Sequence, residues 1–237
     1  MNNSKIIFDI EADGLHPNNV WCIVAKELNG KSHTFDNTQI EEGIKFLQKA
    51  DTLIGHNIIG YDIPVLEKLY DVKFKCNIED TLVMSRLFNP VRENGHSLKA
   101  WGWRVGLLKQ EQPQDFDSYT PEMLEYCIQD VKLNESVYNY LIKEGKIFSD
   151  DSIKIEHDVA KIMKEQENTG FFFNTQQAME LLAELKAKQL DVEDEVHNTF
   201  KPKLVDDKLV TPYVKKDGEL SKRGLTDEEY HNCIETQ

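Results

Sequence analysis

Two carboxylates, Asp9 and Glu11, stand two residues apart at the end of the apolar run Ile6-Ile7-Phe8. A run of β-branched and aromatic residues predicts a buried strand. Side chains two apart on a strand point to the same face, so both acids should lie side by side. Like charges this close repel one another unless a cation lies between them. The pair therefore suggests a metal site at the end of a strand.

Simpler explanations exist for the pair alone. The same spacing recurs in this acidic chain at Asp191-x-Glu193, Asp217-x-Glu219 and Asp227-x-Glu229. An isolated pair is therefore more often a solvated strand end than a metal site. The run Asp9-x-Glu11-x-Asp13-Gly14 also imitates the start of a calcium-binding EF-hand loop, but that loop needs Glu at its twelfth position, where this chain has Val20. A metal site consequently requires acids from elsewhere in the chain.

Asp62 and the pair Tyr126-x-x-x-Asp130 are the candidates for completing the site. Asp62 follows a predicted strand over 52–57, and it would meet Asp9 if that strand neighbours the first. An acid favoured by the dipole at a helix start explains Asp62 equally well. Tyr126 and Asp130, four residues apart, share one helix face. A core tyrosine beside a solvated aspartate gives the same pattern, which recurs at Tyr213–Asp217.

Alternating strand and helix patterns predict the scaffold that positions these residues. Further strands are expected over 20–25 and 31–35, joined through the turn Asn29-Gly30. Asn37 or Thr38 is expected to cap a helix over 40–50, and Ser97 and Thr120 to cap two later helices. The expected helices span 40–50, 61–69, 79–88, 97–105 and 120–146. This order predicts an α/β domain of about 150 residues with a mixed sheet flanked by helices.

From residue 151 the pattern changes to a mostly helical extension. Apolar residues at helical spacing predict helices over 151–170 and from 174 to about 200, and such stripes usually form core or partner-facing surface. The last 35 or so residues are polar, so this tail should not build a core alone.

Composition limits the partners. The 237-residue chain has a net charge of −14, whereas proteins that coat duplex nucleic acid are usually basic. A short single-stranded end remains possible, because metal ions can meet its phosphates. No apolar run approaches about 18 residues, and no signal-peptide core is present, so no membrane partner is expected. The cysteines form no Cys-x-x-Cys pair, which argues against zinc or disulfides and fits a cytoplasmic protein.

Taken in order, the acids and the tyrosine resemble the DEDD superfamily of 3′–5′ exonucleases, tyrosine subclass. The closest likeness is to the proofreading domain of phage family A DNA polymerases. Supporting segments are 9–12, 80–87 and 97–102. The resemblance covers about residues 4–148 and implies a ribonuclease H-like fold, with residues 1–150 as the exonuclease domain. Residues 151–237 resemble an incomplete start of the polymerase region, so no polymerase activity is expected of this chain.

The resemblance implies two Mg²⁺ (or Mn²⁺) ions and a role for each residue. Asp9 would bridge both ions, and Glu11 with Asp130 would complete the site that holds the attacking water. Asp62 would serve the second ion, and Tyr126 would orient the nucleophile. Carboxylates without His or Cys suit such hard cations. The implied partners are the 3′ end of single-stranded DNA and a separate polymerase chain, in the host cytoplasm if the chain is phage-encoded.

For several further residues, a structural explanation stands beside the functional one. By the resemblance, Leu15 matches a leucine that wedges against the terminal bases, although turn packing explains it too. His56 and Asn57 are candidates for contacting the substrate backbone, with structural capping equally plausible. Trp101 and Trp103 are expected in the core rather than as stacking platforms, and Asp80 is expected to start a helix.

Two alternatives to a DNA exonuclease stay open. An RNA-trimming enzyme would use the same four acids, with discrimination by contacts to the 2′-OH. A catalytically silent module that grips a DNA end is the other, although no acid is missing. A Rossmann-type nucleotide binder is excluded because no Gly-x-Gly-x-x-Gly follows the first strand.

Overall fold

The computed structural model describes residues 4–28, 30–111 and 116–201, together with residues 215, 221 and 225. The predicted turn residue Asn29, Cys233 and most of the predicted polar tail lie outside the described residues. Contacts divide the chain into one compact unit, Met1–Phe171, and a second, Phe172–Gln237. The predicted functional division at residue 150 stays a prediction.

A mixed five-stranded sheet forms the centre of the first unit, in the order β3-β2-β1-β4-β5. The central strand β1 (Lys5–Ala12) pairs antiparallel with β2 (Val20–Glu27) and parallel with β4 (Thr52–Gly55). β3 (Ser32–Phe35) extends the sheet beside β2, and β5 (Asn77–Asp80) extends it in parallel beside β4. The predicted mixed sheet is therefore confirmed.

β5 is a strand that the sequence analysis missed. We expected a helix from Glu79, but α3 begins at Thr81 and runs to Phe88. The four residues Asn77–Asp80 include a single apolar side chain, Ile78, and so show no strand period, and pairing with β4 decides their conformation. Asp80 accepts a hydrogen bond from the Leu82 N–H and so caps α3, which confirms its predicted place at a helix start.

The alternation of side chains along β1 produces two different faces. Ile6, Phe8 and Ile10 enter one apolar cluster, whereas Ile7 enters the other. Asp9 belongs to the same alternating set as Ile7, so the acids continue the second face beyond its apolar part. The strand end thus places carboxylates, rather than apolar side chains, on one face of the central strand.

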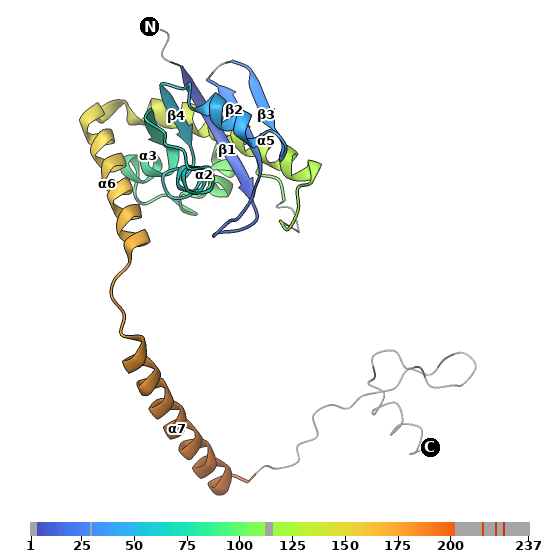
Figure 1. The fold of residues 1–237 in the computed structure, drawn as a ribbon, viewed down its shortest axis with the longest axis vertical. Helices are drawn as coiled ribbons and strands as arrows, with labels where there is room; N and C mark the ends of the chain where they lie inside the picture. The colour runs from blue at the N-terminus through green and yellow to red at the C-terminus, as the bar shows by residue number, and fades with distance from the viewer. Residues whose placement is uncertain are drawn as a thin grey trace. The chain divides into compact units, whose positions relative to one another are not determined.

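Helices cover both faces of the sheet (Figure 1). α1 (Ile40–Leu47) and α2 (Asp62–Tyr70) contribute to the cluster that contains Ile6 and Phe8. α3, α4 (Leu98–Val105) and α5 (Pro121–Glu144) contribute to the cluster that contains Ile7. The sheet is therefore a layer between two layers of helices, and α5 lies on the face to which Asp9 belongs.

Two of the three predicted helix caps are confirmed. Ser97 accepts a hydrogen bond from the Ala100 N–H, and Thr120 accepts one from the Met123 N–H. The prediction that Asn37 or Thr38 caps α1 is wrong, because the N-cap position is Gln39 and has no side-chain bond. The Thr38 hydroxyl instead bonds Asp36 at 2.6 Å, closing a local turn that competes with capping.

The two tryptophans of α4 have different surroundings. Trp101 is fully buried and its indole N–H donates to the Ser85 hydroxyl at 3.0 Å. Trp103 is 69% exposed, so its predicted place in the core is wrong. Residues two apart on a helix do not share a face, and α4 presents only one face to the core.

α6 (Asp150–Thr169) packs against α3 and β5 inside the first unit. Its predicted apolar residues point outward, since Ile155 and Ile162 are 60% and 62% exposed. The buried residue of α6 is His157, whose Nε2 accepts the Asp80 N–H at 2.7 Å. Its Nδ1 lies 2.7 Å from the Ile153 carbonyl oxygen. These bonds require a neutral imidazole with its proton on Nδ1.

α7 (Thr175–Thr199) belongs to the second unit and begins where predicted, with the Asn174 side chain accepting from the Gln177 N–H at 3.1 Å. None of its residues is buried, and its apolar side chains are exposed. In the part of the chain that the structure describes, no helix has the length and apolar character needed to span a membrane.

The His157 contact generates a stability prediction. Replacing His157 with Leu should lower the free energy of unfolding by about 1–3 kcal/mol, because the buried Asp80 N–H loses its acceptor. Urea denaturation measures the change. His197→Leu on α7, where the side chain is exposed, is the control and should leave the midpoint unchanged. An unchanged midpoint for His157→Leu would show that this bond adds nothing.

Candidate active site

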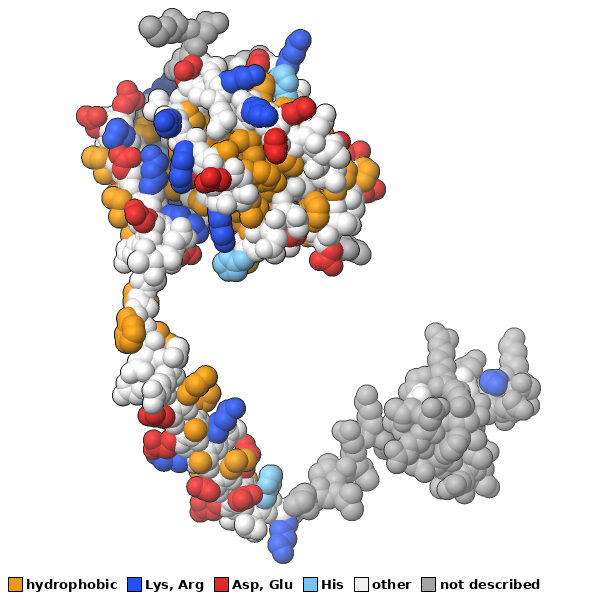
Figure 2. All heavy atoms as spheres, viewed as in Figure 1, with side chains coloured by type: hydrophobic (Ala, Val, Ile, Leu, Met, Phe, Trp, Pro, Cys, Tyr) orange, Lys and Arg blue, Asp and Glu red, His pale blue; other side chains and the backbone are white. Residues whose placement is uncertain are grey.

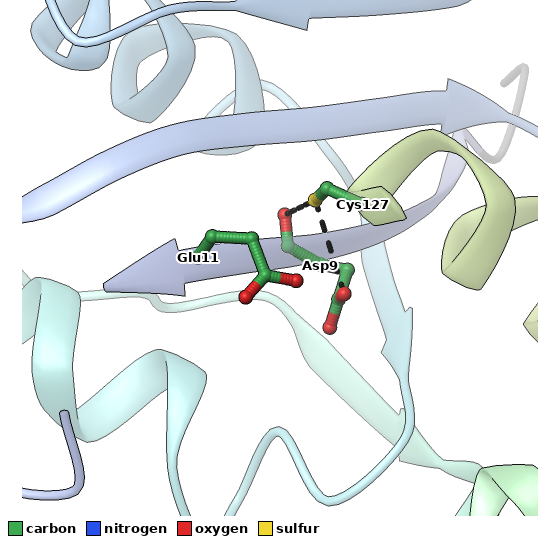
Figure 3. Close-up of side chains that lie close together, drawn as sticks. All are labelled: Asp9, Glu11 and Cys127. Atoms are coloured by element: carbon green, nitrogen blue, oxygen red, sulfur yellow. Dashed lines mark hydrogen bonds between the residues drawn. The ribbon is translucent and has the colours of Figure 1, made fainter. Parts of the chain in front are cut away.

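Asp9 and Glu11 form the centre of the candidate site on β1 (Figure 3). Each offers a carboxylate oxygen in a group whose ligand atoms all lie within 4.8 Å of one another, and the third member is Cys127. Glu11 is buried at 9% exposure. The two carboxylates therefore lie side by side, as their two-residue spacing predicted.

Asp62, the first residue of α2, contacts β1 on the edge where β1 pairs with β4. β1 pairs with β4 only as far as Ile7, so the backbone beyond that point has no partner from β4. The Asp62 carboxylate accepts the N–H of Ile10 at 3.2 Å and occupies this position. The predicted neighbourhood of the two strands is therefore correct, and Asp62 lies buried beside the two acids of β1.

Tyr126 and Asp130 come from α5, which packs across β1 and β2. Both side chains are buried, at 6% and 3% exposure, so the four-residue spacing puts both on the inward face of the helix. Burial is the largest cause that raises the pKa of Asp9 and of Glu11, and the charge of Asp130 raises both further. The structure thus brings all five predicted residues together.

Lys109 is a residue of the site that sequence reasoning missed. Its Nζ lies 2.5 Å from Asp130 Oδ2 and 4.7 Å from the centre of the Tyr126 ring. Burial lowers the pKa of Lys109, but the Asp130 charge and hydrogen bonds to Asp130 and Tyr126 outweigh this and raise it. The lysine therefore stays charged. It lies in a segment without regular structure after α4, where no periodic pattern marks it.

Burial and mutual repulsion favour protonation of the acids. Burial raises the pKa of Glu11 to about 8, with a further contribution from Asp130, and burial raises the pKa of Asp62 to about 7. For Asp9, burial and the charges of Asp62, Glu11 and Asp130 raise the pKa well above its ordinary value, while Lys109 opposes them. One lysine does not neutralise four carboxylates, so the cluster favours additional positive charge.

Cys127 contacts Asp9 but is a poor metal ligand. Its thiol donates to the Asp9 carbonyl oxygen at 3.4 Å and lies 3.8 Å from Asp9 Oδ2. Burial raises the thiol pKa well above its ordinary value, with smaller contributions from Cys22 and Asp9. A metal binds the thiolate, which this environment disfavours. Cys127 therefore serves as a hydrogen-bond donor that orients Asp9.

The three predicted substrate-contact residues lie at the rim of the site. Leu15 is 85% exposed in the turn after β1. His56 Nδ1 lies 2.9 Å from the Thr81 hydroxyl, and burial with the Lys109 charge lowers the imidazole pKa to about 4, so the ring is neutral. Asn57 adopts a left-handed backbone (φ 66°) and donates its N–H to Asp80 at 2.8 Å. Their contact with substrate stays a prediction.

The donor set fits a hard divalent cation. Asp130 Oδ1 is buried and has no hydrogen-bond partner, which leaves one carboxylate oxygen available to a ligand. The other acids supply only oxygen donors, as Mg²⁺ and Mn²⁺ prefer. Residues Asp9, Glu11, Asp62 and Asp130 would hold such ions.

Comparison with solved structures confirms the predicted ribonuclease H-like fold. NrnC of Brucella melitensis matches with a TM-score of 0.56 at 17% identity, covering 71% of this chain and 87% of that protein. One of its structures contains bound Mg²⁺. RNase D of Escherichia coli, described as an exoribonuclease involved in structured RNA processing, matches with a TM-score of 0.52 at 15% identity, covering 68% and 44%. At these identities the likeness shows the fold alone.

Among curated proteins, the chain is distantly homologous to the DNA-directed DNA polymerase of Escherichia phage T7. The two are 26% identical over 210 residues, covering 64% of this chain and 30% of the polymerase. The match therefore spans less than a third of that protein's length. Searched against models of protein families, the sequence matches none.

The raised pKa values predict how stability depends on pH. Between about pH 5 and about pH 8 the folded metal-free protein keeps protons on Glu11 and Asp62 that the unfolded chain releases. Its melting temperature should therefore fall as the pH rises across this range. Added Mg²⁺ should raise the melting temperature more at about pH 8 than at about pH 5, because bound acids must be deprotonated.

Glu11→Gln should flatten this pH dependence, since it removes one titrating group from the cluster. Glu41→Gln is the matched control, because Glu41 lies on α1 with 80% of its side chain exposed. Differential scanning fluorimetry with a chelator measures both. A metal-free melting temperature that rises with pH, or an equal effect of the two substitutions, would contradict the proposed cluster.

Proposed function

We propose that this chain is a metal-dependent 3′–5′ exonuclease that removes nucleotides from the 3′ end of single-stranded or frayed DNA. It would act as the proofreading part of a DNA polymerase, with residues 1–150 as the exonuclease domain. The observation that carries the proposal is the meeting of four acids and Tyr126 from three separate elements in one buried cluster. No structural need explains such repulsion, whereas phosphodiester hydrolysis uses it.

The four carboxylates would hold two divalent cations, Mg²⁺ or Mn²⁺. When bound, these ions supply an activated water and stabilise the leaving 3′-oxygen in an in-line displacement. Asp9 lies at the centre of the cluster, since Asp62, Glu11 and Asp130 all raise its pKa. It is therefore the carboxylate best placed to contact both ions, and Cys127 and the β1 backbone hold it in position.

Tyr126 would orient the attacking water rather than deprotonate it. Burial raises the pKa of its hydroxyl, with a hydrogen bond from Lys109 opposing the shift. The phenol therefore stays protonated at neutral pH and cannot be the base, but it can donate and accept hydrogen bonds. Lys109 would fix the positions of the Tyr126 and Asp130 side chains relative to each other. It would also add positive charge near the scissile phosphate.

DNA is favoured over RNA by the homology to the phage T7 DNA polymerase. The contrary observation is that RNase D, whose fold this chain shares, is an exoribonuclease. RNA trimming is therefore the second candidate. Discrimination between DNA and RNA would rest on protein contacts to the ribose 2′-OH. The four acids would not make such contacts.

Digestion of 5′-labelled single strands tests the proposal. With Mg²⁺, the DNA strand should shorten stepwise from its 3′ end, and Asp9→Ala should abolish cleavage. The variant should keep its fold, because removing one of several clustered charges relieves repulsion. An RNA strand of the same sequence is the parallel substrate. Faster loss of RNA would move the assignment to RNA trimming, and a large loss of melting temperature in metal-free Asp9→Ala would contradict the argument from repulsion.

Tyr126→Phe should separate orientation from metal binding. Loss of the hydroxyl should lower kcat by up to about 100-fold, through misplacement of the nucleophile, while Mg²⁺ affinity stays nearly the same. Turnover and metal titration by calorimetry measure the two effects. Unchanged turnover would remove the role given to the hydroxyl.

A further inference from the structure

A lysine-lined groove adjoins α2, the helix that begins with Asp62. It has a volume of about 630 Å³ and runs between α2, the segment before β5, and α6. Five lysines line it, from all three elements: Lys68, Lys73, Lys75, Lys161 and Lys164. Figure 2 shows Lys and Arg side chains gathered beside α6 on this face.

The charge of this groove is opposite to that of the chain. The whole protein has 28 basic and 42 acidic residues, whereas the groove lining has five lysines and only two acids, Glu67 and Glu165. Such a reversal concentrates the attraction for an anionic ligand on one face.

Several groove lysines are available to a ligand. Lys68 and Lys75 are exposed, and neither makes an ion pair among the residues that the structure describes. The other three pair with surface acids: Lys73 with Glu67 at 2.7 Å, Lys161 with Asp158 at 3.4 Å and Lys164 with Glu167 at 3.1 Å. Pairs at the surface are weak and exchange readily for a stronger anion.

The groove continues toward the acids. A second hollow of about 500 Å³ is lined by Leu15, His16 and Tyr61, and it shares Lys68 and Lys164 with the groove. Tyr61 immediately precedes Asp62, and its hydroxyl donates to the Gly14 carbonyl oxygen at 2.5 Å. The second hollow thus extends the lysine groove to Leu15, in the turn after the strand that carries Asp9 and Glu11, and to Tyr61, the neighbour of Asp62.

We propose that the lysine groove binds the phosphodiester backbone of the strand on the 5′ side of the nucleotide held at the acids. This inference rests on the proposed function and extends it. Lysines contact phosphates as point charges, and an apolar floor accepts bases without reading their sequence. The floor here includes Ile59, Ile63 and Phe74. An acidic protein thereby guides an anionic strand along one basic path to its metal site.

Charge reversal at the two unpaired lysines tests the groove. Lys68→Glu/Lys75→Glu should weaken binding of a fluorescein-labelled single strand of about 12 nucleotides by about tenfold or more, measured by anisotropy in Ca²⁺. The slope of log affinity against log salt should become shallower by roughly 1.4, as about 0.7 is lost per phosphate contact to a single strand. A trinucleotide, too short to span both hollows, should not show this loss.

The matched control is Lys31→Glu/Lys45→Glu, which makes the same change in net charge at exposed positions outside the groove. It should bind the long strand as the unaltered protein does. Lys161→Glu, on the α6 side, should weaken the long strand in the same direction. Equal losses in control and groove variants, a loss that does not depend on strand length, or equal competition by poly-glutamate would each overturn the proposal.

Hydrolysis separates this inference from the function on which it rests. If the unaltered protein cleaves neither DNA nor RNA, the proposed exonuclease is wrong, while the anisotropy comparison still decides whether the groove binds a strand. If cleavage occurs but charge reversal leaves the KM of the long strand unchanged, the groove proposal is wrong and the exonuclease stands.

Discussion

Repulsion among four clustered carboxylates, of which Glu11, Asp62 and Asp130 are buried, is the constraint on which the arrangement of this domain depends. Asp9, Glu11, Asp62 and Asp130 come from a strand and two helices, and each lies where burial raises its pKa. No single element could hold them together against this repulsion. The sheet, with β1 at its centre and α5 across one face, supplies the rigid frame that the cluster requires.

Asp80 connects the frame to the site. Its carboxylate accepts N–H groups of Asn57, Ile59 and Leu82, so one side chain ties the turn after β4 to the start of α3. That turn leads directly into α2 and fixes where Asp62 stands. The N–H of Asp80 in turn donates to His157, so α6 is attached to the same junction. The position of Asp62 therefore depends on Asp80 and His157, which are not members of the acid cluster.

The sequence predicts the parts of this site that repeat regularly, and misses those that depend on distant pairing. Asp9 and Glu11 follow from strand period, and Tyr126 with Asp130 from helix period. The sequence did not predict β5, because four residues show no period. It left open whether the apolar stripe of α6 faces the core, and the structure buries His157 of that helix instead. Lys109 lies in irregular backbone, where only the folded chain reveals its partner.

An acidic chain that handles an anionic substrate must restrict where positive charge lies. Lys109 is placed against Asp130, where it reduces repulsion inside the cluster without neutralising it. The lysines between α2 and α6 lie outside the cluster, where they would attract phosphates without competing for the carboxylates. If the groove lysines stood among the acids, they would take the place of the cations. In the function that we propose, separating the two sets would let the acids bind metal while the groove binds the strand.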